Sequence, residues 1–140
     1  MNDMTCLFCR IAKREIPCYK IYENEYSIAF LDPAKDTDGH ILVIPKKHCK
    51  NIFDCDDFTL SELMRSVKLI SNHLVNSCGF SGVNILNANG EAAQQSVGHF
   101  HIHIIPRKDN DKIDAWIKLN GGITSLEEIQ KKLKVVEQYE

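Results

Sequence analysis

The most constraining feature of this sequence is residues 99–105, where histidine alternates with apolar residues: His-Phe-His-Ile-His-Ile-Ile. Successive side chains of a β-strand point to opposite faces, so His99, His101 and His103 would share one face. Their apolar neighbours would point to the other face and could be buried there. The pattern predicts a strand with one buried face and one face that carries three imidazoles about 6.6 Å apart.

Three imidazoles on one face favour a chemical role. The chain has 6 histidines, and half of them lie within five residues, which is a poor use of an ordinary half-exposed strand. A metal site made of all three is an alternative, because neutral imidazole is a common metal ligand. Alternate positions on one strand do not converge readily on one ion, so such a site would need ligands from elsewhere in the chain.

The rest of the chain predicts an α+β fold. Short segments rich in aromatic and β-branched residues, bounded by turn residues, are typical of strands; they are residues 19–23, 26–31, 40–44, 83–86 and 97–105. Asn24 and Glu25 would form a tight turn, and Pro45 and Pro106 would end strands. Short strands joined by tight turns favour a five-stranded antiparallel sheet with helices packed on one face.

Helical patterns occur in three places. Residues 8–13 could form a short helix, and residues 59–78 carry apolar side chains at helical spacing behind a capping box of Thr59 and Glu62. A second capping box, Ser125 and Glu128, predicts a helix near the C-terminus. We therefore expect one domain over residues 1–106 and a C-terminal extension over residues 107–140.

Composition excludes several classes of protein. The net charge of -2 argues against a general nucleic-acid binder. No apolar run approaches the length of a membrane span, and the N-terminal residues resemble no signal peptide. We expect a cytoplasmic protein with six reduced cysteines. Cys18, Cys49, Cys55 and Cys78 would be small buried apolar residues, whereas the pair Cys6 and Cys9 fits either redox or metal chemistry.

The histidine pattern resembles the signature of the histidine triad (HIT) family, and four other segments resemble its Hint branch. These are residues 13–17, 29–32, 42–48 and 95–97, and the similarity covers about residues 5–106. In the nucleotidyltransferase branches the third triad position is usually glutamine; His103 therefore favours a hydrolase. The resemblance also implies a homodimer in which two sheets join edge to edge.

The resemblance assigns catalytic roles. His101 would attack the α-phosphorus of a nucleotide and form a nucleotidyl-histidine that water then hydrolyses. A neutral imidazole is a good nucleophile when its other nitrogen holds the proton, and a backbone carbonyl would fix that proton. His103 would donate to a non-bridging phosphate oxygen, and His40 would support the triad from a neighbouring strand. Ser96 matches the residue that contacts the leaving group, which favours an amine leaving group.

The resemblance also implies a nucleotide site. Asp32 would accept from the ribose hydroxyls, although Asp32-Pro33 could simply end a strand. The purine would lie against apolar residues that could equally be core: Leu7, Phe8, Ile11, Phe30 and Leu42. Asn87 and Asn89 lie near the family's loop asparagine, and Gln95 is either a nucleotide contact or a loop residue.

Many bacterial members of the family carry a structural zinc. The matching ligands here are Cys6, Cys9, His48 and His99, and two thiolates with two imidazoles make a closed tetrahedral site. The alternative is a pair of reduced cysteines beside a histidine that only orients His101.

Three functions remain open at this point. The first is a purine nucleoside phosphoramidase that cleaves AMP–amine conjugates through His101. The second is a dinucleoside polyphosphate hydrolase, a branch that usually has glutamine where Ser96 stands. The third is a nucleotide-binding or scaffold protein with little activity.

Overall fold

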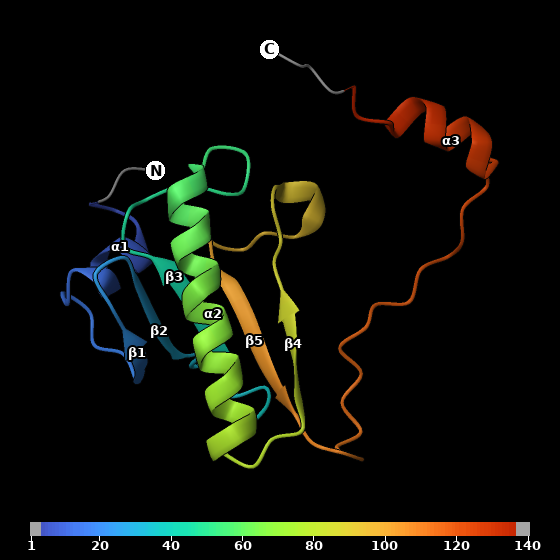
Figure 1. Cartoon of the computed structure of the whole chain (residues 1–140). Coiled ribbons are helices and arrows are strands. Elements are labelled where there is room, and N and C mark those ends of the chain that lie inside the picture. Colours follow the sequence, from blue (N-terminus) through green and yellow to red (C-terminus); the bar gives the residue numbers. More distant parts are fainter. Residues whose placement is uncertain (1–3, 137–140) are drawn as a thin grey trace.

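The computed structural model describes residues 4–136, and a five-stranded antiparallel sheet lies at its centre (Figure 1). The strands are β1 (Lys20–Glu23), β2 (Ser27–Leu31), β3 (Ile41–Pro45), β4 (Gly82–Leu86) and β5 (Ile102–Arg107), in the order β1-β2-β3-β5-β4. The helices are α1 (Leu7–Ala12), α2 (Asp57–Ser77) and α3 (Leu126–Leu133), with a short 3₁₀ turn, η1, at Glu91–Ala93. The predicted α+β fold with its antiparallel sheet is confirmed.

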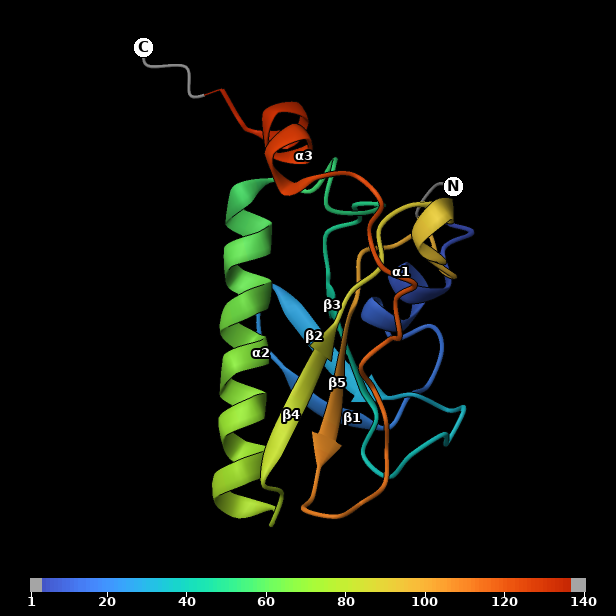
Figure 2. The same ribbon diagram turned by 90° about the vertical axis from the view of Figure 1, so that its right-hand side faces the viewer.

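Helices α2 and α1 lie on opposite faces of the sheet (Figure 2). The two faces bury different clusters of side chains. The long helix α2 covers one face, where Leu63, Val67 and Ile70 pack against strand residues that include Phe100, Ile102 and Ile104. The short helix α1 packs on the opposite face through Phe8 and other side chains. Only α2 therefore occupies the face that we expected the helices to share. The second face, with α1 over it, is the one that receives the histidines.

Local hydrogen bonds explain where the elements begin. The Asn24 side chain accepts from the backbone N–H groups of Tyr26 and Ser27, both at 2.9 Å, and so closes the predicted β1–β2 turn. Helix α2 starts before the predicted capping box. Asp56 is its N-cap, because its carboxylate accepts from the backbone N–H of Thr59 at 2.8 Å. A carboxylate also suits the positive end of a helix.

Two prolines lie inside strands that we predicted they would end. Pro45 pairs with Ser27 of β2, and Pro106 pairs with Val83 of β4. The β3–β5 pairing extends only from Val43↔Ile102 to Ile41↔Ile104, so each proline has a neighbouring strand on one side alone. A missing N–H costs nothing where no strand lies opposite it.

The cysteines differ from the prediction of six reduced, mostly buried thiols. Cys49 and Cys55 form a disulfide with a Cα–Cα distance of 5.2 Å, and both are buried. Cys78 is exposed because it is the C-cap residue after the last turn of α2 and does not lie on the apolar face of the helix. The disulfide closes a short loop directly after His48. The spacing of the two cysteines in the sequence could not show whether they form a disulfide or remain separate thiols.

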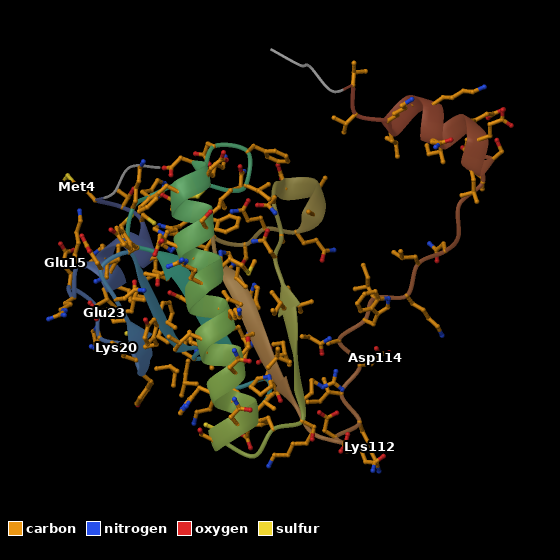
Figure 3. The ribbon with its side chains drawn as sticks, viewed as in Figure 1. Met4, Glu15, Lys20, Glu23, Lys112 and Asp114 are labelled. Carbon is orange, nitrogen blue, oxygen red and sulfur yellow. A yellow bond between two sulfur atoms is a disulfide. The ribbon has the colours of Figure 1, made fainter. Side chains whose placement is uncertain are left out.

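The segment after β5 extends away from the sheet (Figures 1 and 3). Lys112 and Asp114 lie on its first part, and α3 lies further along. Helix α3 follows Ser125 as predicted, since the Ser125 hydroxyl accepts from the backbone N–H of Glu128 at 3.3 Å. No helix of residues 4–136 is both long and apolar enough to cross a membrane.

Candidate active site and metal centre

The histidine segment keeps its alternation although only its second half belongs to a strand. β5 begins at Ile102, five residues later than predicted, because the backbone N–H of Phe100 donates to the Cys49 carbonyl at 2.7 Å instead of to a neighbouring strand. His99 and His101 nevertheless lie on the α1 side, where the Phe8 ring meets both of them edge-on at 5.9 and 5.3 Å between ring centroids.

The imidazole of His101 is buried and held in one tautomer. Its Nδ1 donates to the His99 carbonyl oxygen at 2.7 Å, and a carbonyl can only accept. In the neutral ring the proton is therefore on Nδ1, and Nε2 keeps its lone pair. The Asn87 amide donates to the carbonyl of His101 at 2.8 Å, which fixes the backbone that carries the ring.

His103 and His40 form a directly bonded pair beside His101. His40 Nε2 lies 2.9 Å from His103 Nδ1, and the rings of His101 and His103 are 4.9 Å apart. The pKa of His103 is lowered to about 4, first by burial and then by the neighbouring His101 and His40, while Asp32 and Asp36 act in the opposite direction. His103 is therefore neutral in the isolated protein at neutral pH.

Two carboxylates face the other side of His40. Its Nδ1 lies 2.7 Å from Asp36 Oδ1 and 3.8 Å from Asp32 Oδ2. The hydrogen bond to His40 holds the pKa of Asp36 below its usual value. The prediction assigned Asp32 to the ribose and did not include Asp36. The sequence held no signal for Asp36 beyond its being one of three acids, with Asp32 and Asp38, shortly before His40.

Four side chains converge on one point beside the triad, as predicted for the metal centre. One ligand atom from each of Cys6, Cys9, His48 and His99 lies within 4.8 Å of all the others. His99 Nδ1 is 3.3 Å from Cys6 Sγ and 3.5 Å from Cys9 Sγ, and it is 3.1 Å from His48 Nδ1. A tetrahedral zinc with usual bond lengths needs such separations to be about 3.3–3.8 Å.

The tautomer of His99 also suits a metal. Its Nε2 donates to the Pro45 carbonyl at 2.8 Å, so in the neutral ring Nδ1 presents a lone pair to the cluster. Cys6 is in addition the N-cap of α1 and accepts from the backbone N–H of Cys9. The helix start thus places both sulfur atoms on the same side as the two imidazoles. The donor set fits a structural zinc ion.

The loop between β4 and β5 is held by its own amide side chains. Gln95 Nε2 donates to the carbonyls of Lys50 and Val97 at 2.7 and 2.9 Å, while its oxygen accepts from the Gly90 N–H at 2.9 Å. Asn89 bonds Asn87 and accepts from the Ile52 N–H. The Gln95 amide therefore closes the loop. Within residues 4–136, no hydrogen bond joins the exposed Ser96 to the histidines.

The apolar residues expected to contact the purine are mostly buried around the site. Phe8 and Phe30 pack edge-on at 5.7 Å between ring centroids. Together with Ile11 and Leu42 they belong to the cluster on the histidine face of the sheet, whereas Leu7 is exposed. The structure thus brings four of the five to the same side of the sheet as the triad.

Comparison with known proteins shows the family of this chain. The HIT domain family matches residues 13–110, and the chain belongs to the HIT family. An uncharacterized HIT-like protein of Borreliella burgdorferi is 44% identical over 93% of this chain and 96% of its own length. Adenosine 5'-monophosphoramidase HNT1 of Saccharomyces cerevisiae is 36% identical over 94% of this chain and 82% of its own.

One of the similar solved structures is of a zinc-bound protein. The crystal structure of a zinc-bound histidine triad family protein from Mycobacterium smegmatis superposes with a TM-score of 0.77 at 34% sequence identity. The match covers 81% of this chain and 83% of the other. The fold of this chain is therefore that of the HIT family.

Proposed function

We propose that this protein is a hydrolase of purine nucleoside phosphoramidates, that is, of AMP–amine conjugates, and that His101 is its nucleophile. The observation that carries the proposal is the fixed tautomer of His101, whose Nδ1 proton bonds the His99 carbonyl at 2.7 Å. That bond leaves the Nε2 lone pair available for attack. The similarity to an adenosine 5'-monophosphoramidase supports a hydrolase that acts on a nucleotide.

In the first step His101 Nε2 forms a bond to the α-phosphorus and the P–N bond breaks. The leaving amine takes the bond electrons and a proton, which the Ser96 hydroxyl supplies and regains from water. His101 becomes an N-phosphorylated imidazolium that keeps its Nδ1 proton on the His99 carbonyl. That carbonyl stabilises the positive ring, since a charge-assisted hydrogen bond is stronger than a neutral one.

In the second step water attacks the phosphorus of the nucleotidyl-histidine. The bond to Nε2 breaks, AMP leaves, and His101 returns to its neutral form as the attacking water loses a proton to solvent. In both steps His103 donates from Nε2 to a non-bridging oxygen and stabilises the negative charge there. His40 and His99 hold their neighbours in place.

The nucleoside would bind beside these histidines. Asp32, partly buried and next to His40, would accept from the ribose hydroxyls. The purine would lie against the apolar side chains predicted above, with Leu7 as the exposed member. Asn87 and Asn89 would present amide groups near the phosphate after rearrangement of the loop.

We propose in addition that Cys6, Cys9, His48 and His99 hold a structural zinc ion. Such an ion would link α1 to the segment that carries His101, because Cys6 and Cys9 lie at the start of α1 and His99 lies in that segment. With four protein ligands it has no open position for substrate, so its part is to fix the scaffold.

We further propose a homodimer. In residues 4–136, β4 pairs only with β5, and its Ile85 and Leu86 are 47% and 39% exposed. The described part of the extension, residues 107–136, adds large exposed apolar side chains, among them Trp116. A second copy of the chain would cover such surfaces. Sedimentation velocity at micromolar concentration should then give the mass of two chains.

The test of the function is turnover of adenosine phosphoramidate and of a diadenosine polyphosphate by the same preparation. We expect faster turnover of the phosphoramidate, and its loss in His101→Ala with nucleotide binding retained. His73, an exposed histidine on α2, gives the matched control His73→Ala, which should keep full activity. Preference for the polyphosphate would favour the second function, and binding without turnover of either compound would favour a nucleotide-binding protein.

A further inference from the structure

The proposed function requires a proton on His103 Nε2, and the hydrogen bonds of the His40–His103 pair limit which ring nitrogens carry protons. Protons can occupy three positions along the pair. They are His40 Nδ1, the hydrogen bond between His40 Nε2 and His103 Nδ1, and His103 Nε2. Two neutral imidazoles carry only two protons between them. The environment decides which positions are filled.

The first two positions are filled by the geometry. His40 Nδ1 lies 2.7 Å from the Asp36 carboxylate, which can only accept, so this nitrogen holds a proton. The bridge of 2.9 Å between His40 Nε2 and His103 Nδ1 requires a second proton, since two bare nitrogen atoms repel each other at that distance. A neutral pair therefore has no proton left for His103 Nε2.

Donation from His103 to a phosphate oxygen thus requires a third proton, which gives the pair a charge of +1. His103 itself resists the charge, because burial and two neighbouring histidines hold its pKa near 4. His40 is the ring next to the carboxylates. The titratable groups that face the pair are Asp32 and Asp36 from the loop before His40 and His101 from the histidine segment.

We propose that Asp36 is a positioning residue whose carboxylate is the counter-ion of a protonated His40, so that neutral His103 can donate from Nε2 to the phosphoryl group. This inference rests on the proposed function, which requires the third proton, and on the hydrogen-bond geometry, which places the Asp36 carboxylate against His40. Asp36 accepts the hydrogen bond from His40 Nδ1 at 2.7 Å, whereas the Asp32 carboxylate lies 3.8 Å from that nitrogen, too far for a hydrogen bond.

Nitrogen NMR of the imidazole rings tests the inference without any substrate. In wild type at neutral pH we expect signals of two protonated ring nitrogens for His40 and of one for His103. In Asp36→Asn the amide oxygen can still accept from Nδ1 but the charge is gone, so His40 should show the signals of a neutral ring. Asp38→Asn removes the same charge from an exposed residue of the same loop and should leave the wild-type signals.

Kinetics supply the second readout. In Asp36→Asn we expect kcat for adenosine phosphoramidate to fall about tenfold at pH 7.5, as for a change of one unit in a protonation equilibrium, with KM unchanged. The loss should shrink as the pH is lowered, and Asp36→Glu should restore part of kcat. Identical His40 signals and pH profiles in wild type and Asp36→Asn would overturn the role of Asp36. An inactive wild type would overturn the proposed function, while the nitrogen signals would still decide this inference.

Discussion

Removal of the proposed zinc ion should destabilise the protein by an amount that can be calculated. The four ligand atoms already lie close to tetrahedral spacing, and three of the four residues are buried, so binding needs little rearrangement. A ligand at a thousand times its Kd stabilises the folded state by about 4 kcal/mol. At roughly 3 °C per kcal/mol for a chain of this length, chelation should lower Tm by about 12 °C.

The assay combines elemental analysis with calorimetry. The protein as purified should hold close to one zinc ion per chain. Cys9→Ser should hold none, and its Tm should equal that of wild-type protein after chelation. Cys78→Ser, which replaces an exposed cysteine away from the cluster, should keep both the zinc and the Tm. Equal Tm values before and after complete chelation, or absence of zinc from freshly purified protein, would refute the reasoning.

Three further predictions concern stability. The pKa of His103 is lowered from 6.5 to about 4 in the folded state, so between these pH values the unfolded chain binds the proton and the folded chain does not. The contribution of His103 to the free energy of unfolding is therefore complete above pH 6.5 and is lost as the pH falls from 6.5 to 4. Urea denaturation across this range should show that the free energy of unfolding depends less steeply on pH in His103→Phe than in wild type. An unchanged slope would contradict the lowered pKa of His103. Asp56→Ala should cost about 1 kcal/mol through loss of the α2 N-cap, whereas Asp57→Ala should cost less. Replacement of both Cys49 and Cys55 by serine should cost about 2 kcal/mol, from the loop entropy of a bridge that spans 6 residues, and a stability equal to wild type would show that the bridge does not form.

The sequence predicted the parts of the fold that depend on local patterns. The alternation in residues 99–105 placed the apolar side chains under α2 and the histidines on the opposite face, even though the strand is shorter than expected. The Asn24 turn and the Ser125 cap were predictable because each rests on hydrogen bonds between near neighbours. The cluster of Cys6, Cys9, His48 and His99 was reached through the family resemblance.

The features that were missed depend on partners distant in the sequence. The ends of β3 and β5 could not be predicted, because whether Pro45 or Pro106 is tolerated depends on which strand lies beside it. The Cys49–Cys55 disulfide depends on the path of the loop between them. Asp36 was missed because its contact with His40 follows from the loop conformation, and any of several acids there could have made it.

The central claim is that His101 is the nucleophile, and a covalent intermediate tests it most directly. Wild-type protein mixed with adenosine phosphoramidate and quenched in base within the first turnovers should show a mass increase of one AMP, and peptide analysis should place it on His101. His101→Ala should show no adduct. Turnover with no adduct at any quench time, or an adduct on another residue, would contradict the account.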